Sequence, residues 1–367
     1  MNNLKKLGLT ALAGSLAAVS ANAGEMSVSG AFNATYVTVD GNTGTPASDH
    51  GIGLGNDKDV TFSGSGELDN GWTFSGYTLM KEAGGFDISS SALSMTMGSM
   101  GTVTTGSGYG GNSTKYDQQT PTAYEEFDDA ASQTLSANIV GNTLDNNSIT
   151  YTSPSFDLGG FSASLDIEYS PEATGTSPND GGSQQAADTG NGRSLGVTVS
   201  GAGLKLGVYG SQVEYDGASA RVGDTFEGVW YANYTMGPVS VGYSQSYLDR
   251  GLDTTTATAA TTGKTIGTAG GLFEATSMSI AFKVNDDFSV SYGKADDTYD
   301  AQSNASSGTE IADVDVEHKH IAAAYSMGAM SIKAYRSEAT NLQYISCLLY
   351  TSPSPRDRTR SRMPSSA

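Results

Sequence analysis

The sequence predicts an all-β fold, a transmembrane antiparallel β-barrel for which sixteen strands are expected. Three observations predict it. Apolar and polar residues alternate along many segments, and the connections between these segments are alternately short and long. After the N-terminal leader, no apolar run is long enough for a membrane-spanning helix. Fifteen strands can be counted before residue 346. Because bacterial barrels have even strand numbers, we expect the closing strand to be missing.

Residues 1–23 have the pattern of a secretory signal peptide. Lys5 and Lys6 precede a short apolar segment, and Ala21-Asn22-Ala23 supplies a small-residue cleavage site. The apolar part is too short to span a bilayer comfortably, which argues against a membrane anchor. We therefore expect the mature chain to begin at Gly24.

The last residues, CLLYTSPSPRDRTRSRMPSSA (347–367), do not match the rest of the chain. They contain Cys347 and four arginines, and they show no strand pattern. The string resembles a translated sequencing adapter, the alternative being an Arg-rich disordered tail. We expect residues 24–346 to form the barrel domain and 347–367 to be a non-native tail outside it.

The charge balance excludes a nucleic-acid partner. Of 19 basic residues, two lie in the leader and four in the tail, and of 39 acidic residues one lies in the tail. The remaining segment therefore has a net charge of −25, the wrong sign for binding phosphates. The same segment has no cysteine, so no disulfide stabilises it after export.

The first strands show the alternation most clearly. In 25–39, Met26, Val28 and Phe32 share a face opposite Ser27 and Ser29. Segments 59–68 and 72–81 follow the same rule, and Asp-Asn-Gly at 69–71 between them is typical of a hairpin turn, which needs positive φ. The same pattern predicts further strands at 87–97, 101–106, 147–153, 161–169, 193–200, 204–214, 225–235, 239–248, 272–284, 288–295, 317–325 and 330–338.

The connections separate into two kinds. Short ones lie at 69–71, 98–100, 154–160, 201–203, 236–238, 285–287 and 326–329. Between them come mostly long polar ones, at 40–57, 82–86, 107–146, 170–192, 215–224, 249–271 and 296–316. Short turns at one end and long loops at the other are the layout of an outer-membrane barrel, whereas a soluble sandwich has no reason to segregate them.

A barrel in a membrane has its apolar face toward lipid and its polar face toward the lumen. In segment 161–169, Asp166 and Glu168 should therefore line water inside, and Phe161, Leu165, Ile167 and Tyr169 should face lipid. Aromatic girdles are expected from residues near strand ends, namely Tyr36, Trp72, Tyr151, Tyr169, Tyr234, Tyr243, Tyr247 and Tyr325.

Three stretches carry a resemblance to a known family. NSITYTSPSFDLGGFSASLDIEY (147–169), GEMSVSGAFNATYVTVDG (24–41) and DVTFSGSGELDNGWTFSGY (59–77) resemble Gram-negative general porins, and the likeness extends over most of 24–346. The resemblance implies a sixteen-stranded barrel in the outer membrane of a Gram-negative bacterium. It also implies a homotrimer, surrounded by lipid and lipopolysaccharide, that lets ions and small hydrophilic solutes diffuse. Porins usually end in an aromatic residue, whereas this chain ends in Ser-Ser-Ala, which puts closure and assembly in doubt.

The resemblance also implies that the third external loop, 107–146, folds into the barrel and narrows it. This loop carries Asp117, Glu125, Glu126, Asp128 and Asp129. Facing like charges, these carboxylates would favour cations, whereas facing basic wall residues they would create a transverse field. The alternative is that the acidic run is a solvated external loop.

Candidate wall residues follow from strand parity. Lys81 lies on the lumen-parity face, whereas Lys58 has the parity of lipid-facing Val60 and is a weaker candidate. The sequence does not rank the other basic strand residues, Arg193, Lys205, Lys283, Lys294, Lys333 and Arg336.

Metal and enzyme chemistry find little support. Acidic external residues could hold divalent cations, but Asp249, Asp253, Asp296, Asp297 and Asp300 lack calcium-loop spacing, so we assign no metal and no cofactor. The three histidines, His50, His318 and His320, accompany no nucleophile motif, and the i, i+2 pair alone is weak evidence for a metal site. We expect no enzymatic activity.

Two alternatives stay open beside a general, cation-preferring diffusion pore. The barrel could select a substrate such as a sugar, phosphate or peptide, but Tyr77, Tyr209 and Tyr231 do not form a clear aromatic track. It could instead be a non-conducting surface adhesin, which loops such as GLDTTTATAATTGKTIGTAGG would suit.

Overall fold

The computed structural model describes the protein at residues 26–39, 51–82, 86–117, 119–124, 144, 148–171, 190–214, 221–222, 224–249, 251–253, 271–301, 314–337 and 342–351. Within these ranges the helical segments are two single turns of 3₁₀ helix, Gly98–Met100 and Ser113–Lys115. None of the helices found in these ranges is both long enough and apolar enough to cross a membrane.

The described residues form nineteen strands. In chain order they are β1 Met26–Val39, β2 Gly51–Glu67, β3 Thr73–Glu82, β4 Phe86–Thr96, β5 Thr102–Ser107, β6 Ser148–Thr152, β7 Phe156–Asp157, β8 Ser162–Ser170, β9 Gly192–Gly201, β10 Leu204–Val213, β11 Arg221–Val222, β12 Thr225–Met236, β13 Val239–Asp249, β14 Leu252–Asp253, β15 Gly271–Lys283, β16 Phe288–Ala301, β17 Val314–Met327, β18 Met330–Ser337 and β19 Leu342–Thr351.

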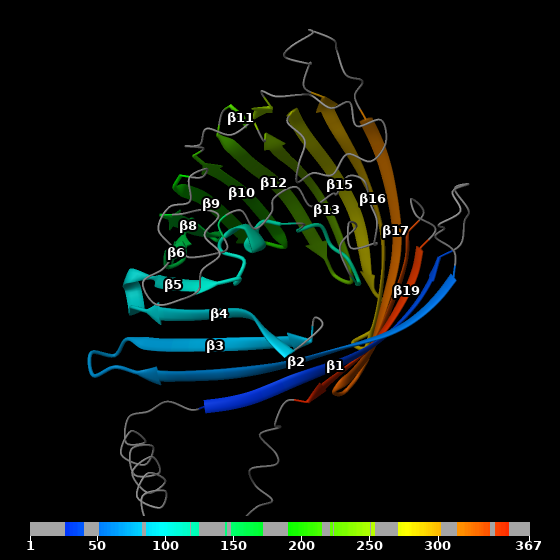
Figure 1. The fold of residues 1–367 in the computed structure, drawn as a ribbon, viewed down its shortest axis with the longest axis horizontal. Helices are drawn as coiled ribbons and strands as arrows, with labels where there is room; N and C mark the ends of the chain where they lie inside the picture. The colour runs from blue at the N-terminus through cyan, green and yellow to red at the C-terminus, as the bar shows by residue number, and fades with distance from the viewer. Residues whose placement is uncertain are drawn as a thin grey trace, which may run out of the picture.

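The strands close into a barrel. Neighbours in the main sheet pair antiparallel, and the order returns to its start because β1 pairs with both β2 and β19. β6 and the two-residue β7 both pair with β8, so they form one interrupted strand and the ring has sixteen positions. A closed ring leaves no unpaired edge. Figure 1 shows the strands curving around a central space.

The turn between β2 and β3 shows why the hairpin prediction succeeds. Gly71 has φ +81°, and its N–H donates to the Leu68 carbonyl at 2.8 Å. The Asn70 side-chain oxygen accepts from the Trp72 N–H at 3.0 Å. The glycine supplies the left-handed conformation and the asparagine closes the turn.

Two strands extend beyond their predicted ends. β2 begins at Gly51 rather than 59, and its first residue pairs with Val39 at the end of β1. β16 continues to Ala301 rather than 295, paired with Gly271 of β15. The extension of β2 contains glycines and that of β16 contains aspartates, both of which are typical of loops. In each case the neighbouring strand supplies the backbone hydrogen-bond partners that keep the extension in the sheet. A separate ladder joins β11 to β14, inside two predicted loops.

The expectation that the closing strand is missing is wrong for this structure. β19 occupies the sixteenth position, with Arg336 of β18 opposite Gln343 and Tyr36 of β1 opposite Ile345. Its last five residues, 347–351, belong to the predicted non-native tail, which was expected to carry no strand. Both edges of the open ring offer backbone hydrogen-bonding groups that an extended segment can satisfy. Because such pairing needs no alternation of side chains, the sequence pattern could not find this strand.

The two faces of the sheet have opposite character. Leu195, Val208 and Ile321 point outward and are 54%, 61% and 54% exposed. Small hydroxyl residues point inward and are buried, among them Ser194, Ser211, Ser244, Ser277 and Ser291. Exposed apolar side chains outside and polar ones inside suit a lipid surrounding and a wet interior. Of the girdle candidates, Tyr36, Tyr169, Tyr234 and Tyr325 are exposed, while Trp72, Tyr151, Tyr243 and Tyr247 are half-buried.

Candidate functional site

The segment after β5 turns into the barrel at a cluster of glycines. Gly108, Gly110 and Gly111 have φ values of +59°, +82° and +54°, a region that L side chains rarely adopt. A Cβ at Gly111 would overlap the carboxylate of Glu168 on β8. The glycines therefore allow both the sharp turn and the close approach to the wall. In Figure 1 the teal segment after β5 crosses the inside of the curved sheet.

Glu168 on β8 accepts a hydrogen bond from the first part of this loop. One of its carboxylate oxygens accepts from the Asn112 N–H at 3.1 Å and the Ser194 hydroxyl at 3.1 Å, and the other accepts from the Ser148 hydroxyl at 2.8 Å. The side chain is only 1% exposed. Three donors stabilise the buried carboxylate, as a buried polar group requires.

Asp166, two residues earlier on the same face of β8, holds the next part of the loop. Its Oδ1 accepts from Lys115 Nζ at 2.5 Å and from the Thr152 hydroxyl at 2.6 Å, and its Oδ2 accepts from the Tyr116 hydroxyl at 2.7 Å. Asp166 is 2% exposed, whereas the Lys115 side chain is 43% exposed. The aspartate is thus buried and neutralised by a lysine of the loop.

Tyr116 is the centre of an aromatic contact between loop and wall. Its ring stacks on Tyr209 of β10 with centroids 5.1 Å apart and is fully buried together with Tyr231 and Val229 of β12. Gly196 of β9 leaves the space that the ring fills, since a Cβ there would overlap it. Burial raises the pKa of the Tyr116 hydroxyl above its ordinary value, so it stays a donor.

The loop continues along the wall as far as β18. Lys205 Nζ donates to Gln119 Oε1 at 2.7 Å, and the Ser279 hydroxyl donates to the Pro121 carbonyl at 2.6 Å. The Ala123 N–H then donates to the Ser291 hydroxyl at 2.8 Å. Beyond it, the Tyr124 ring lies 5.9 Å from that of Tyr335 and under Lys333 Nζ. Residues 112–124 therefore contact side chains on strands from β6 to β18, and Val37 of β1 packs against the cluster of Tyr124 and Tyr335.

The predicted wall carboxylates face inward, but they do not line water. Asp166 and Glu168 lie beneath the loop and bind it, so the expectation that they line the wet lumen is corrected. Parity finds the face of a side chain, whereas the loop that covers it lies about fifty residues earlier in the sequence. Sequence reasoning also missed Lys115 and Tyr116. Lys115 is the single basic residue of 107–146 and follows the glycine-rich GSGYGG, which was an available signal.

The two predicted wall lysines lie on different faces. Lys81 is exposed, and in the strand register it lies directly opposite Asp59 of β2, in an inward-facing row. Lys58 lies opposite Phe32 of β1 in the strand register, and the Phe32 side chain points outward and is 41% exposed. Lys58 is therefore not a pore-wall residue. The strand runs without a bulge there, so the parity argument against Lys58 holds.

Of the five acidic loop residues, Asp117 lies in the described part, directly after the docked Tyr116. Glu125, Glu126, Asp128 and Asp129 lie outside the described residues. Among the unranked bases, Lys205 and Lys333 face inward and contact the loop. Lys283 pairs with Asp286 at 2.8 Å beside a short turn. Arg193, Lys294 and Arg336 share the outward side of their strands.

No group of three or more histidine, cysteine or acidic residues in the described part of the chain is arranged to hold a metal ion. Asp296 lies on the outward face of β16 and Asp297 on the inward face, so the run of aspartates does not converge.

A family model described as Gram-negative porin matches residues 8–343. No curated protein sequence matches the chain.

Solved structures share the fold. OmpF of Salmonella typhi in complex with daunomycin superposes with a TM-score of 0.66 at 11% identity, covering 89% of this chain and 98% of that one. A porin refined at 1.8 Å gives 0.58 at 15%, covering 89% of this chain and 100% of that one. A mutant porin of Rh. blastica gives 0.52 at 14%, with coverage of 89% and 100%. With a family match over most of its length, the chain belongs to the Gram-negative porins.

Proposed function

We propose that this porin is a general diffusion channel for ions and small hydrophilic solutes that prefers cations. Family membership places it in the outer membrane of a Gram-negative bacterium as a channel rather than an enzyme. The preference for cations and the breadth of the solute range are our inference. The observation that carries it is the polar loop docked inside the barrel.

The docked loop supports a water-filled pore of reduced width. Residues 112–124 lie along inward-facing side chains through hydrogen bonds to Glu168, Asp166 and Ser291. The exposed residues among those described in this segment, Thr114, Lys115 and Thr122, are polar, so the segment leaves the lumen polar. Such a constriction discriminates by size and charge rather than by a fitted pocket.

The burial and positions of the three tyrosines considered for a sugar track argue against such a track and favour general diffusion. Tyr209 and Tyr231 are 3% and 1% exposed, covered by the loop, and so do not present their faces to a solute. Tyr77 lies on β3, away from both of them in the ring. No continuous aromatic path joins the three residues.

The proposed cation preference follows from charge. The acidic run at 117–129 belongs to the loop that enters the barrel, and the barrel segment has a strong negative net charge. A confined aqueous path with an excess of one sign of charge concentrates ions of the other sign.

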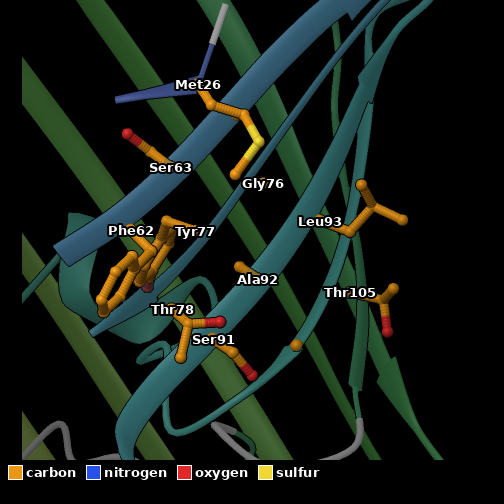
Figure 2. Close-up of a pocket in the computed structure, with 12 residues that line it drawn as sticks. Met26, Phe62, Ser63, Gly76, Tyr77, Thr78, Ser91, Ala92, Leu93 and Thr105 are labelled. Carbon is orange, nitrogen blue, oxygen red and sulfur yellow. The ribbon is translucent and has the colours of Figure 1, made fainter. Parts of the chain in front are cut away.

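We further infer that the protein assembles as a homotrimer through the outer face of β1–β5. There, a row of opposing residues runs Met26, Gly64, Gly76, Leu93, Thr105, and its glycines leave a groove of about 460 Å³ (Figure 2). The adjacent row carries Thr78 and Ser91 beside Phe62. Small and hydroxyl residues suit packing against another protein better than contact with lipid chains.

The outer face also supports contact with lipopolysaccharide headgroups. Beyond the outward pair Tyr292 and Ile321, the outward side chains become charged. Lys294 pairs with Glu317 at 2.8 Å and Asp296 at 3.0 Å, and Lys319 pairs with Glu317 at 2.8 Å. Charges that begin where the apolar belt ends suit the headgroup layer.

Single-channel recording in planar bilayers tests the function. We expect stepwise conductance in groups of three and a reversal potential of cationic sign in a salt gradient. Neutralising Glu125, Glu126, Asp128 and Asp129 together should weaken the preference. A correctly inserted barrel that carries no current would refute the diffusion-pore proposal and favour the adhesin alternative.

A further inference from the structure

A β-bulge in β4 decides which residues of this strand face the lumen. The register between β3 and β4 shifts between Leu79 and Met80: Leu79 opposes Ser90, but Met80 opposes Ile88. Ser89 is therefore an extra residue. A bulge of this kind reverses the facing of every residue beyond it.

The reversal turns Asp87 inward. By strict alternation Asp87 would share the outward face of Leu93, which is 53% exposed. With Ser89 bulged, Ile88 is the outward residue, at 67% exposed, and Asp87 lies opposite Lys81. The bulge thus removes a carboxylate from the lipid face and places it beside the lysine predicted for the pore wall.

A second carboxylate flanks the same lysine from the other side. Asp59 of β2 directly opposes Lys81, and its Oδ1 accepts from the Ala31 N–H at 2.9 Å. Directly opposed residues share a face with Cβ atoms roughly 5 Å apart. The inward row therefore reads Asp59, Lys81, Asp87 across three strands, with Lys81 and Asp87 exposed and Asp59 half-buried.

The row lies on a different part of the wall from the docked loop. The hydrogen bonds and ring contacts of residues 112–124 described above are with strands from β6 to β18, and Val37 of β1 packs against the cluster that contains Tyr124. The row lies on β2–β4. It carries two negative charges and one positive charge. A basic wall, which a transverse field across the pore would need, is thus absent from this row.

We propose that Asp59 and Asp87 are selectivity-determining residues of this channel: they offset Lys81 and make the β2–β4 wall favour cations. This inference rests on the proposed diffusion function. It gives this part of the wall a net acidic charge, in place of the basic wall that a transverse field would need.

The test is the potassium-to-chloride permeability ratio of the full-length protein, measured from reversal potentials at about 0.1 M salt, where a charge acts over roughly 10 Å. The variants are D59N/D87N, K81M and, as a matched control, K58M, which removes the lysine next to Asp59 on the outward face. Circular dichroism and heat resistance of each variant in detergent establish that the barrel is folded.

We expect D59N/D87N to lower the ratio about threefold, because it removes two negative charges, and K81M to raise it up to about twofold, because it removes one positive charge. Screening by water and salt limits both effects. K58M should leave it unchanged. An unchanged ratio in folded D59N/D87N channels, or an equal change in K58M, would overturn the inference. Wild-type barrels that carry no current would instead refute the diffusion function, so the two failures are distinguishable.

Discussion

Lys115 of the inward-folded loop donates to the buried carboxylate of Asp166 on β8 at 2.5 Å. The aspartate is enclosed by the loop, and the lysine remains partly open to the lumen. The wall thus uses a negative charge to hold the loop rather than to attract solutes. Because Thr152 and Tyr116 donate to the same carboxylate, the ion pair belongs to a network that joins loop, β6 and β8.

Lys115→Met should loosen the loop. The substitution leaves the Asp166 carboxylate buried without its cation, which costs roughly 1–3 kcal/mol once the exposure of the lysine is discounted. We expect noisier single-channel currents and a lower melting temperature, read by planar-bilayer recording and circular dichroism.

A second ion pair provides the control. Lys283 and Asp286 are 2.8 Å apart, but both are exposed, so Lys283→Met should change neither readout measurably. Adding Asp166→Asn to Lys115→Met should recover part of the lost stability, because it removes the uncompensated charge. Quiet, wild-type currents in Lys115→Met would show that the ion pair does not hold the loop.

Glu168→Leu should destabilise the loop root through unsatisfied donors. The Asn112 N–H and the hydroxyls of Ser148 and Ser194 would lose their acceptor in a buried site, at about 1–3 kcal/mol for each donor that finds no other partner. Thermal unfolding measures the loss. Glu67→Leu, an exposed site at the end of β2, is the comparison, and an equal loss there would contradict the argument.

The sequence predicted the strands and their faces better than it predicted what covers them. Alternation places Asp166, Glu168 and Ile167 on the correct sides, because facing depends only on neighbours in the same strand. Burial of Asp166 depends on Lys115 and Tyr116, about fifty residues away, and no local pattern encodes that contact.

The inward position of Asp87 was unpredictable for a different reason. It depends on one extra residue, Ser89, whose presence is visible only in the register between β3 and β4. A serine in a run of serines gives no sign of a bulge. Lys58 is the opposite case: its strand is regular, and parity alone placed it outward.

Gly196→Ala should displace Tyr116. The added methyl group would occupy the space of the phenol ring, so the ring must leave its stack with Tyr209 or the wall must shift. We expect altered mean conductance and a lower melting temperature. Gly53→Ala is the control, because its Cβ would meet nothing within 4 Å, and the two variants should differ clearly.

Gly64→Leu tests the proposed contact between subunits. A Cβ at Gly64 would lie 3.9 Å from the Met26 side chain, an ordinary contact, so the barrel itself accepts a side chain there. The leucine would fill the outer groove over β1–β5 and exclude a neighbouring subunit from it. We expect trimers to dissociate at lower temperature on native gels, while the monomer keeps its strand content by circular dichroism. Val208→Phe enlarges an outward residue of β10, 61% exposed and outside this face, and should leave the trimer intact. Trimers that are as heat-resistant in Gly64→Leu as in the wild type would place the subunit contact elsewhere on the barrel.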